Sequence, residues 1–141
     1  MSGKIAWRSL ARKTEFQKVY AEGAKSVGRL LVVYLLPAAD AARAVVASRK
    51  VGGAVQRNRA KRLLREAFRK DTLAGVADLS GISQRLTTVA APEDGAEAPP
   101  SQSLWIVLVA RRAILAAGIA EVQDELDTLL RALLPDDEST R

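Results

Sequence analysis

The sequence predicts an α+β fold, a small α/β sandwich in which helices pack on a mixed sheet. Short runs rich in Val and Leu and bounded by Pro or Gly are typical of strands. Apolar residues at helical spacing predict amphipathic helices, and the two kinds of segment alternate along the chain. The expected order is α-β-β-α-β-α. The 141 residues, 48% of them hydrophobic, are enough for one domain with a core.

The first element is a short helix. We expect it to begin at Thr14, because Thr14 and Gln17 fit a capping box in which the hydroxyl accepts a free backbone N–H. Gly23 is placed to end the helix in a left-handed turn. One face carries apolar residues at positions i, i+3 and i+4: Phe16, Val19 and Tyr20.

Two strands are expected next, over Arg29–Leu36 and Arg43–Arg49. Pro37 and a short Ala/Asp linker separate them, which predicts an antiparallel hairpin with a longish loop. Side chains alternate between the two sides of a strand. The first strand therefore places Leu30, Val32 and Tyr34 on one side and Leu31, Val33 and Leu35 on the other.

A helix over Ala54–Lys70 follows the Gly52-Gly53 pair and is the best-defined element of the sequence. Its apolar residues repeat at i, i+3, i+4, i+7 and i+8, which predicts one buried stripe. They are Ala60, Leu63, Leu64, Ala67 and Phe68. The opposite face carries Asn58, Lys61, Arg62, Arg65 and Arg69.

The second half of the chain begins with residues 71–103, which become acidic and rich in Pro, Gly and Ala and are expected to form a flexible insertion. Leu104–Ala110 is continuously apolar, which predicts a strand buried on both faces or at the centre of a sheet. A helix over Gly118–Leu134 follows and stops at Pro135. We expect one α/β domain over residues 1–135 and a frayed tail over residues 136–141.

Composition excludes several kinds of site. The chain has no Cys and no His, so disulfides, thiolate or imidazole metal ligands and serine–histidine dyads are absent. No apolar run approaches the roughly 20 residues of a membrane-spanning helix, and no signal peptide is visible. We therefore expect a cytoplasmic protein with no membrane partner.

Positive charge is concentrated in one segment. Residues 49–70 carry nine basic side chains and one acidic side chain, although the net charge of the whole chain is only +6. On the helix over Ala54–Lys70 this places guanidinium and ammonium groups about one turn apart, and Arg matches a phosphate with two parallel N–H donors. The pattern indicates RNA binding; a solvated basic surface helix is the alternative. Asn58 is either a surface amide or a contact to RNA sugar or base edges.

The sequence Val51-Gly-x-Ala-Val-x-Arg57-Asn58-Arg59-x-Lys61-Arg62-Leu63-x-Arg65-x-x-Phe68 closely resembles the signature helix of the bacterial ribonuclease P protein subunit. The flanking segments resemble the same family in the same order. They are Leu10-x5-Phe16-x2-Val19-Tyr20-x2-Gly23, Arg29-x-x-Val32-x-Tyr34 and Val107-x-x-Ala110-Arg111. About 100 of the 141 positions are covered in register.

The resemblance implies a fold like the second domain of ribosomal protein S5, with a left-handed βαβ crossover. It also implies an endoribonuclease holoenzyme in which a large RNA cleaves precursor tRNA to give mature 5′ ends. That RNA and its Mg²⁺ carry out the chemistry, so no catalytic or metal-binding residue and no DNA partner are expected in this chain. The positions implied to bind the catalytic RNA are Arg57, Asn58, Arg59, Lys61, Arg62, Arg65 and Arg69. Those implied to bind the single-stranded 5′ leader of the tRNA are Phe16, Tyr20, Val32 and Tyr34, with Arg12 and Lys50 beside them.

Other interpretations remain open from the residues alone. Phe16, Tyr20 and Tyr34 also fit ordinary core packing. A ribosomal or other structural RNA-binding protein of the same fold would share the basic helix. A nuclease that uses carboxylates would need clustered acids, for which the sequence offers Asp124, Glu125 and Asp127 on the solvated face of the last helix. The chain departs from the family pattern at Leu31, where an aromatic residue is common, at Gly53, where Asn is common, and in the long segment 71–103.

Overall fold

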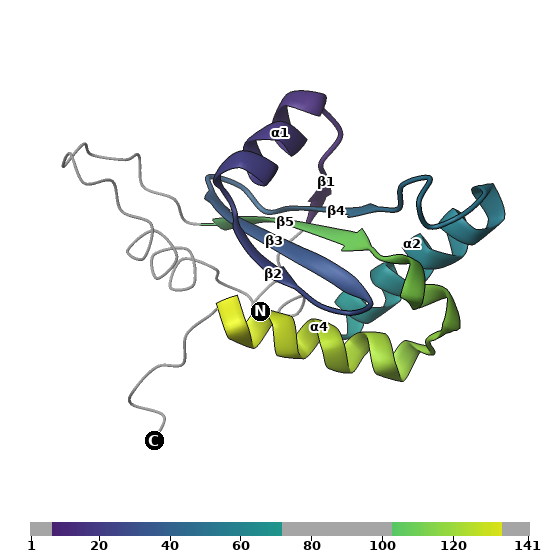
Figure 1. Ribbon diagram of the computed structural model, residues 1–141. Coiled ribbons are helices and arrows are strands. Elements are labelled where there is room, and N and C mark those ends of the chain that lie inside the picture. Colours follow the sequence, from purple (N-terminus) through teal and green to yellow (C-terminus); the bar gives the residue numbers. More distant parts are fainter. Residues whose placement is uncertain (1–6, 72–102, 134–141) are drawn as a thin grey trace, which may run out of the picture.

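The computed structural model describes residues 7–71 and 103–133. A five-stranded mixed sheet in the order β1-β4-β5-β3-β2 forms its centre. Helices α2 and α4 lie against one face of the sheet and α1 lies against the other (Figure 1). The elements are β1 (Arg8–Ser9), α1 (Lys13–Glu22), β2 (Ala24–Val27), β3 (Leu31–Ala38), β4 (Ala42–Val46), α2 (Ala54–Lys70), β5 (Ser103–Ala110), the 3₁₀ helix η2 (Arg112–Ala116) and α4 (Ile119–Leu133).

The predicted hairpin between the two Val/Leu-rich strands is wrong. Strands β3 and β4 are not neighbours, because β5 lies between them, antiparallel to β3 and parallel to β4. The apolar character of β5, which correctly predicted a central strand, explains this arrangement: it is the strand most suited to burial on both faces. The hairpin partner of β3 is instead β2, a short strand that the sequence analysis missed.

Strand boundaries also differ from those predicted. Pro37 does not end β3, which continues to Ala38. Strand β2 pairs with β3 only as far as Leu35, so beyond that residue β3 is hydrogen-bonded on one side, where a residue without an N–H is tolerated. Strand β4 ends at Val46, short of the predicted Arg49.

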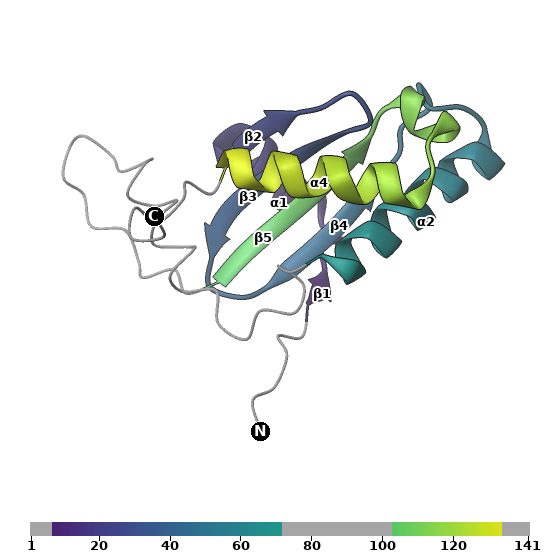
Figure 2. The same cartoon turned by 90° about the horizontal axis from the view of Figure 1, so that it is seen from below.

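The β4–α2–β5 crossover has the hand that the family resemblance implies. In Figure 2 the helices face the viewer, and the parallel strands β4 and β5 both run from lower left to upper right. Strand β5 lies to the upper left of β4. A path that leaves β4, passes through a helix in front of the sheet and returns to a strand on the left is left-handed, the rare hand for such a connection.

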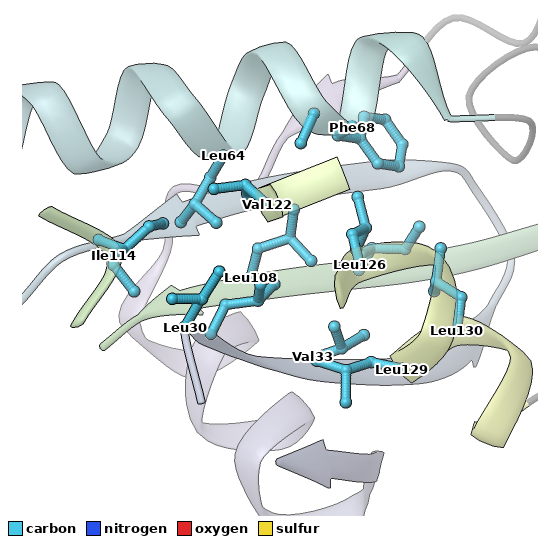
Figure 3. Packing of buried hydrophobic residues seen from close by; sticks show 14 of the residues in the cluster. Leu30, Val33, Leu64, Phe68, Leu108, Ile114, Val122, Leu126, Leu129 and Leu130 are labelled. Atoms are coloured by element: carbon cyan, nitrogen blue, oxygen red, sulfur yellow. The ribbon is translucent and has the colours of Figure 1, made fainter. Parts of the chain in front are cut away.

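The main core lies between the sheet and helices α2 and α4. The predicted stripe of α2 is largely buried, with Leu64 fully enclosed and Leu63 half-buried beside it. It meets Leu126 and its neighbours from α4 and Leu108 from β5 (Figure 3). Helix α4 matches its predicted range of Gly118–Leu134 except at the termini, and Leu134 lies outside the described residues.

A smaller core lies under α1, where Val19 is fully buried. The predicted capping box of Thr14 and Gln17 is wrong, because the N-cap is Arg12, two residues before Thr14, and α1 begins at Lys13. Glu15 caps it instead: its Oε1 accepts the backbone N–H of Arg12 at 3.3 Å. A carboxylate three residues into the helix is a stronger acceptor here than a hydroxyl, and it favours the helix N-terminus by its charge.

Gly23 follows α1 without the expected left-handed conformation, since its φ is −75°. A Cβ at this position would lie 2.6 Å from the carbonyl oxygen of Val19, so close approach of the backbone requires glycine here. Within the described ranges, no helix has the length and apolar character needed to cross a membrane. The predicted insertion (residues 71–103), apart from its first and last residues, and the predicted tail (136–141) lie outside these ranges, and Ser103 already belongs to β5.

Candidate nucleic-acid interface

Helix α2 is positioned by a tight turn at the end of β4. Gly52 has a φ of +150°, a conformation that side chains rarely adopt, and it turns the chain toward the helix. Gly53 then donates its backbone N–H to Oε1 of Gln56 at 2.6 Å, which caps the first turn. Val51 is buried just before this turn and anchors it to the main core.

The outer face of α2 carries the predicted row of polar and basic side chains, which we call the α2 stripe. Helical spacing of three or four residues brings its members together along the helix. Arg57 and Lys61 are half-buried and the others are exposed. The α2 stripe consists of Arg57, Asn58, Arg59, Lys61, Arg62, Arg65 and Arg69.

Most of this charge has no carboxylate partner among residues 7–71 and 103–133. Glu66 pairs with Arg69 at 2.6 Å and with Lys70 at 3.3 Å. Hydrogen bonding by Lys70 and the nearby positive charges lower the pKa of the Glu66 carboxyl. In the described part of the chain no ion pair involves the other five cations of the α2 stripe, and Asn58 makes no side-chain hydrogen bond. These groups therefore present donors to solvent or to a polyanion, whereas Arg69 is already partly neutralised.

A second group of predicted residues meets on the opposite side of the sheet. Phe16 and Tyr20 from α1 have ring centroids 6.3 Å apart, and Tyr20 and Tyr34 lie edge to face at 4.9 Å. We call these three residues the aromatic cluster. Tyr20 is 42% exposed, and its pKa is raised by burial and by the neighbouring Tyr34. Phe16 also packs against the small core, so it has a structural role whatever it binds.

Two further residues extend this surface and were missed in the sequence. Lys25 of β2 holds its ammonium group 5.7 Å from the ring centroid of Tyr34. Val27, paired with Val32 across the β2–β3 ladder, is 54% exposed. Paired residues share one face of a sheet, so Val32, Val27, Lys25 and Tyr34 line the same side as α1. The sequence signal for β2 is the alternation of more buried and more exposed residues that begins at Ala24. This pattern covers only four residues directly after a helix, which is too short to be recognised as a strand.

The remaining predicted leader-binding residues, Arg12 and Lys50, are exposed, and in the described part of the chain no cation–π contact joins either side chain to the aromatic cluster. Arg12 stands at the N-terminus of α1. Lys50 lies in the turn after β4, where its backbone N–H donates to Oγ of Ser48 at 3.3 Å. Their assignment to the leader site remains a prediction.

Two of the three candidate acids of α4, Glu125 and Asp127, have structural partners. Glu125 Oε2 accepts the backbone N–H groups of Leu30 at 2.6 Å and Leu31 at 3.0 Å. Asp127 pairs with Arg131 at 3.0 Å. Over residues 7–71 and 103–133, no group of three or more acidic side chains is arranged to hold a metal ion. The described residues therefore do not fit a magnesium site of their own.

Comparison with known proteins identifies a family whose members match the segment that contains α2. The family profile described as Ribonuclease P matches residues 6–81. The ribonuclease P protein component of Coprothermobacter proteolyticus is 45% identical over 62 residues, covering 44% of this chain and 52% of the relative. That of Dehalococcoides mccartyi is 45% identical over 62 residues, covering 43% and 52%. The chain thus spans about half the length of the curated relatives it matches.

Solved structures have the same fold. A mutant RNase P protein of Staphylococcus aureus superposes with a TM-score of 0.62 and 21% identity, covering 88% of this chain and 86% of that one. The RNase P protein of Thermotoga maritima superposes with a TM-score of 0.58 and 21% identity, covering 88% and 96%. The profile match extends over more than half of the residues and includes α1, the sheet strands β2 to β4 and the whole of α2. The chain belongs to the ribonuclease P protein family.

Proposed function

We propose that this chain is the protein subunit of ribonuclease P. It binds the catalytic RNA through the α2 stripe and assists removal of the 5′ leader from precursor tRNA. One observation carries the proposal: five cations without carboxylate partners in the described ranges stand on a helix whose other face is locked into the core. Such a surface is complementary to a phosphate backbone and is formed before the RNA arrives.

The side chains of this chain suit a supporting role, with the cleavage reaction left to the RNA. With no histidine, no cysteine and no described acidic metal cluster, the chain offers positioning and charge neutralisation rather than acid–base groups. Cleavage would be carried out by the RNA, whose phosphates would hold the magnesium ions. We propose a cytoplasmic ribonucleoprotein that acts without membrane or DNA partners.

The aromatic cluster is the proposed site for the unpaired leader. Stacking on an aromatic ring contributes about 1–3 kcal/mol per base and tolerates any sequence, which suits leaders that differ between tRNAs. The half-exposed ring of Tyr20, the adjacent ring of Tyr34 and the cation of Lys25 supply stacking and a nearby positive charge.

The test is precursor-tRNA cleavage by a bacterial ribonuclease P RNA at low magnesium, with and without this chain. We expect the chain to restore cleavage. Tyr20→Ala and Tyr34→Ala should weaken binding of precursor tRNA by about 5- to 150-fold, the range that corresponds to one lost stack. Tyr34→Phe keeps the ring and should retain binding. Binding of mature tRNA, which lacks a leader, should be the same for all three variants as for the wild-type protein.

Two outcomes would count against the proposal. Tight, salt-sensitive RNA binding without restored cleavage would favour a structural RNA-binding protein of the same fold. Restored cleavage, with binding of mature tRNA weakened by the tyrosine variants as much as binding of precursor tRNA, would remove the leader site from the aromatic cluster while leaving the subunit assignment intact.

A further inference from the structure

Arg43 is a basic residue that the sequence analysis placed only at the start of a strand. In the structure it lies on β4 and is half-buried, with its guanidinium carbon 5.4 Å from the ring centroid of Phe68 on α2. Phe68 is in turn fixed by Trp7, whose ring meets it edge to face at 5.2 Å. The guanidinium of Arg43 is therefore held against α2 by the ring of Phe68 rather than free in solvent.

A second guanidinium stands beside this one. Arg65 precedes Phe68 by three residues on α2, and residues at that spacing are neighbours on a helix surface. Burial and, after it, the positive charge of Arg65 lower the pKa of Arg43. Neither arginine pairs with a carboxylate among residues 7–71 and 103–133.

This arrangement is unfavourable for the free protein. A partly desolvated cation without a counter-charge is costly, and a second cation beside it adds repulsion. The contact with Phe68 offsets part of that cost. An aliphatic side chain of similar length would pack on the same ring without the penalty, so stability alone does not account for arginine at this position.

We propose that Arg43 and Arg65 form a phosphate-binding site at the edge between β4 and α2, and that one phosphate of the RNA backbone occupies it. Two planar guanidinium groups fit the oxygens of a single phosphate through parallel N–H donors. Arg65 belongs to the α2 stripe, so the site is continuous with that surface and extends it onto the sheet. The choice of RNA as the source of the phosphate rests on the proposed function.

The experiment compares Arg43→Met with the wild-type protein and with a matched control, Arg131→Met. Arg131 is an exposed arginine of α4 that pairs with Asp127, so the control removes the same charge elsewhere. Affinity for ribonuclease P RNA is measured over a range of salt concentrations. Arg43→Met is expected to lose about sixfold in affinity at 0.1 M salt and to lower the salt slope by about 0.7–0.9, the value for one phosphate contact. Arg131→Met should change both quantities much less.

Two measurements on the free protein separate binding from folding. The melting temperature of Arg43→Met should equal or exceed that of wild type, because the variant removes an uncompensated cation and keeps the contact with Phe68. Inorganic pyrophosphate should raise the melting temperature of wild type and of Arg131→Met, but much less that of Arg43→Met.

Different results would contradict the phosphate site and the proposed function. If RNA affinity, salt slope and the pyrophosphate effect do not depend on Arg43, the phosphate site is wrong. A marked drop in the melting temperature of Arg43→Met would instead assign Arg43 a structural role. If wild type fails to bind the RNA while pyrophosphate still stabilises it through Arg43, the phosphate site stands and the proposed function falls.

Discussion

Glu66 offers a way to increase the charge of the α2 stripe without altering any of its cations. Its carboxylate lies 2.6 Å from Arg69 and 3.3 Å from Lys70. Glu66→Gln keeps the shape of the side chain, removes the negative charge and releases both cations. We expect this variant to bind ribonuclease P RNA more tightly than wild type, because phosphate is the remaining counter-charge for the released groups.

The magnitude follows from the number of cations. Each neutralised phosphate contributes about 0.7–0.9 to the slope of log K against log salt. The five cations of the α2 stripe that have no ion-pair partner within the described ranges therefore predict a wild-type slope of about 4. Each released cation adds about 0.8 to the slope. Between 1 M and 0.1 M salt that slope amounts to about sixfold in affinity. Glu66→Gln should therefore bind about 6- to 40-fold more tightly at 0.1 M salt, depending on whether one or both cations reach a phosphate.

The matched control is Asp127→Asn. Asp127 also pairs with a basic residue one turn away on a helix, at 3.0 Å from Arg131, so its neutralisation changes the net charge equally. RNA titrations at four or five salt concentrations give affinity and slope for each protein. If Glu66→Gln binds no more tightly than Asp127→Asn, or with an unchanged slope, the α2 stripe is not the surface that meets the RNA.

Three other predictions concern the scaffold. Glu125→Ala should lower the free energy of unfolding by about 2–4 kcal/mol in urea titrations, because two backbone N–H groups lose a charged acceptor, whereas Asp124→Ala should change it by less than about 0.5 kcal/mol. Leu126→Ala, at a fully buried position, should cost about 2–5 kcal/mol in the same assay; a cost below 1 kcal/mol would contradict the main core described here. Absorbance titration should find Tyr20 ionising above the ordinary tyrosine pKa of 10.0, and Tyr34→Phe should bring its pKa closer to that value. Because the folded-state pKa is raised, the stability linked to Tyr20 should be complete below pH 10 and lost as pH rises through the raised pKa.

The elements with long, regular patterns could be predicted from the sequence. Helices α2 and α4 match their predicted ranges almost to the residue, since each carries a buried stripe over three turns or more. Sheet order could not be predicted in the same way. Proximity along the chain favoured a hairpin between β3 and β4, whereas the structure places β5 between them although a long segment separates it from both. Burial of the most apolar strand outweighed the advantage of a local connection.

In the candidate site, too, residues on one helix could be predicted from the sequence, whereas residues brought together by the sheet could not. The α2 stripe lies on one helix, so its spacing alone determined which side chains face outward. The aromatic cluster joins α1 to β3, and only the family resemblance placed its members together. Lys25, Val27 and Arg43 depend on the register of β2 and β4 against their neighbours, which no short sequence window contains.

Helix α2 carries a charge pattern that opposes its own folding. Like charges one turn apart, such as Lys61 and Arg65, each cost a few tenths of a kcal/mol in an isolated helix. The opposite face buries Leu64 and Phe68 at 3% exposure or less, and full burial of such a side chain contributes about 1.5–3 kcal/mol. Packing therefore outweighs the repulsion, and the main core holds the cations in place in the absence of RNA. The RNA then gains the full charge interaction without having to order the helix, because the stability of α2 comes from its packing against the sheet and α4 and not from the helix itself.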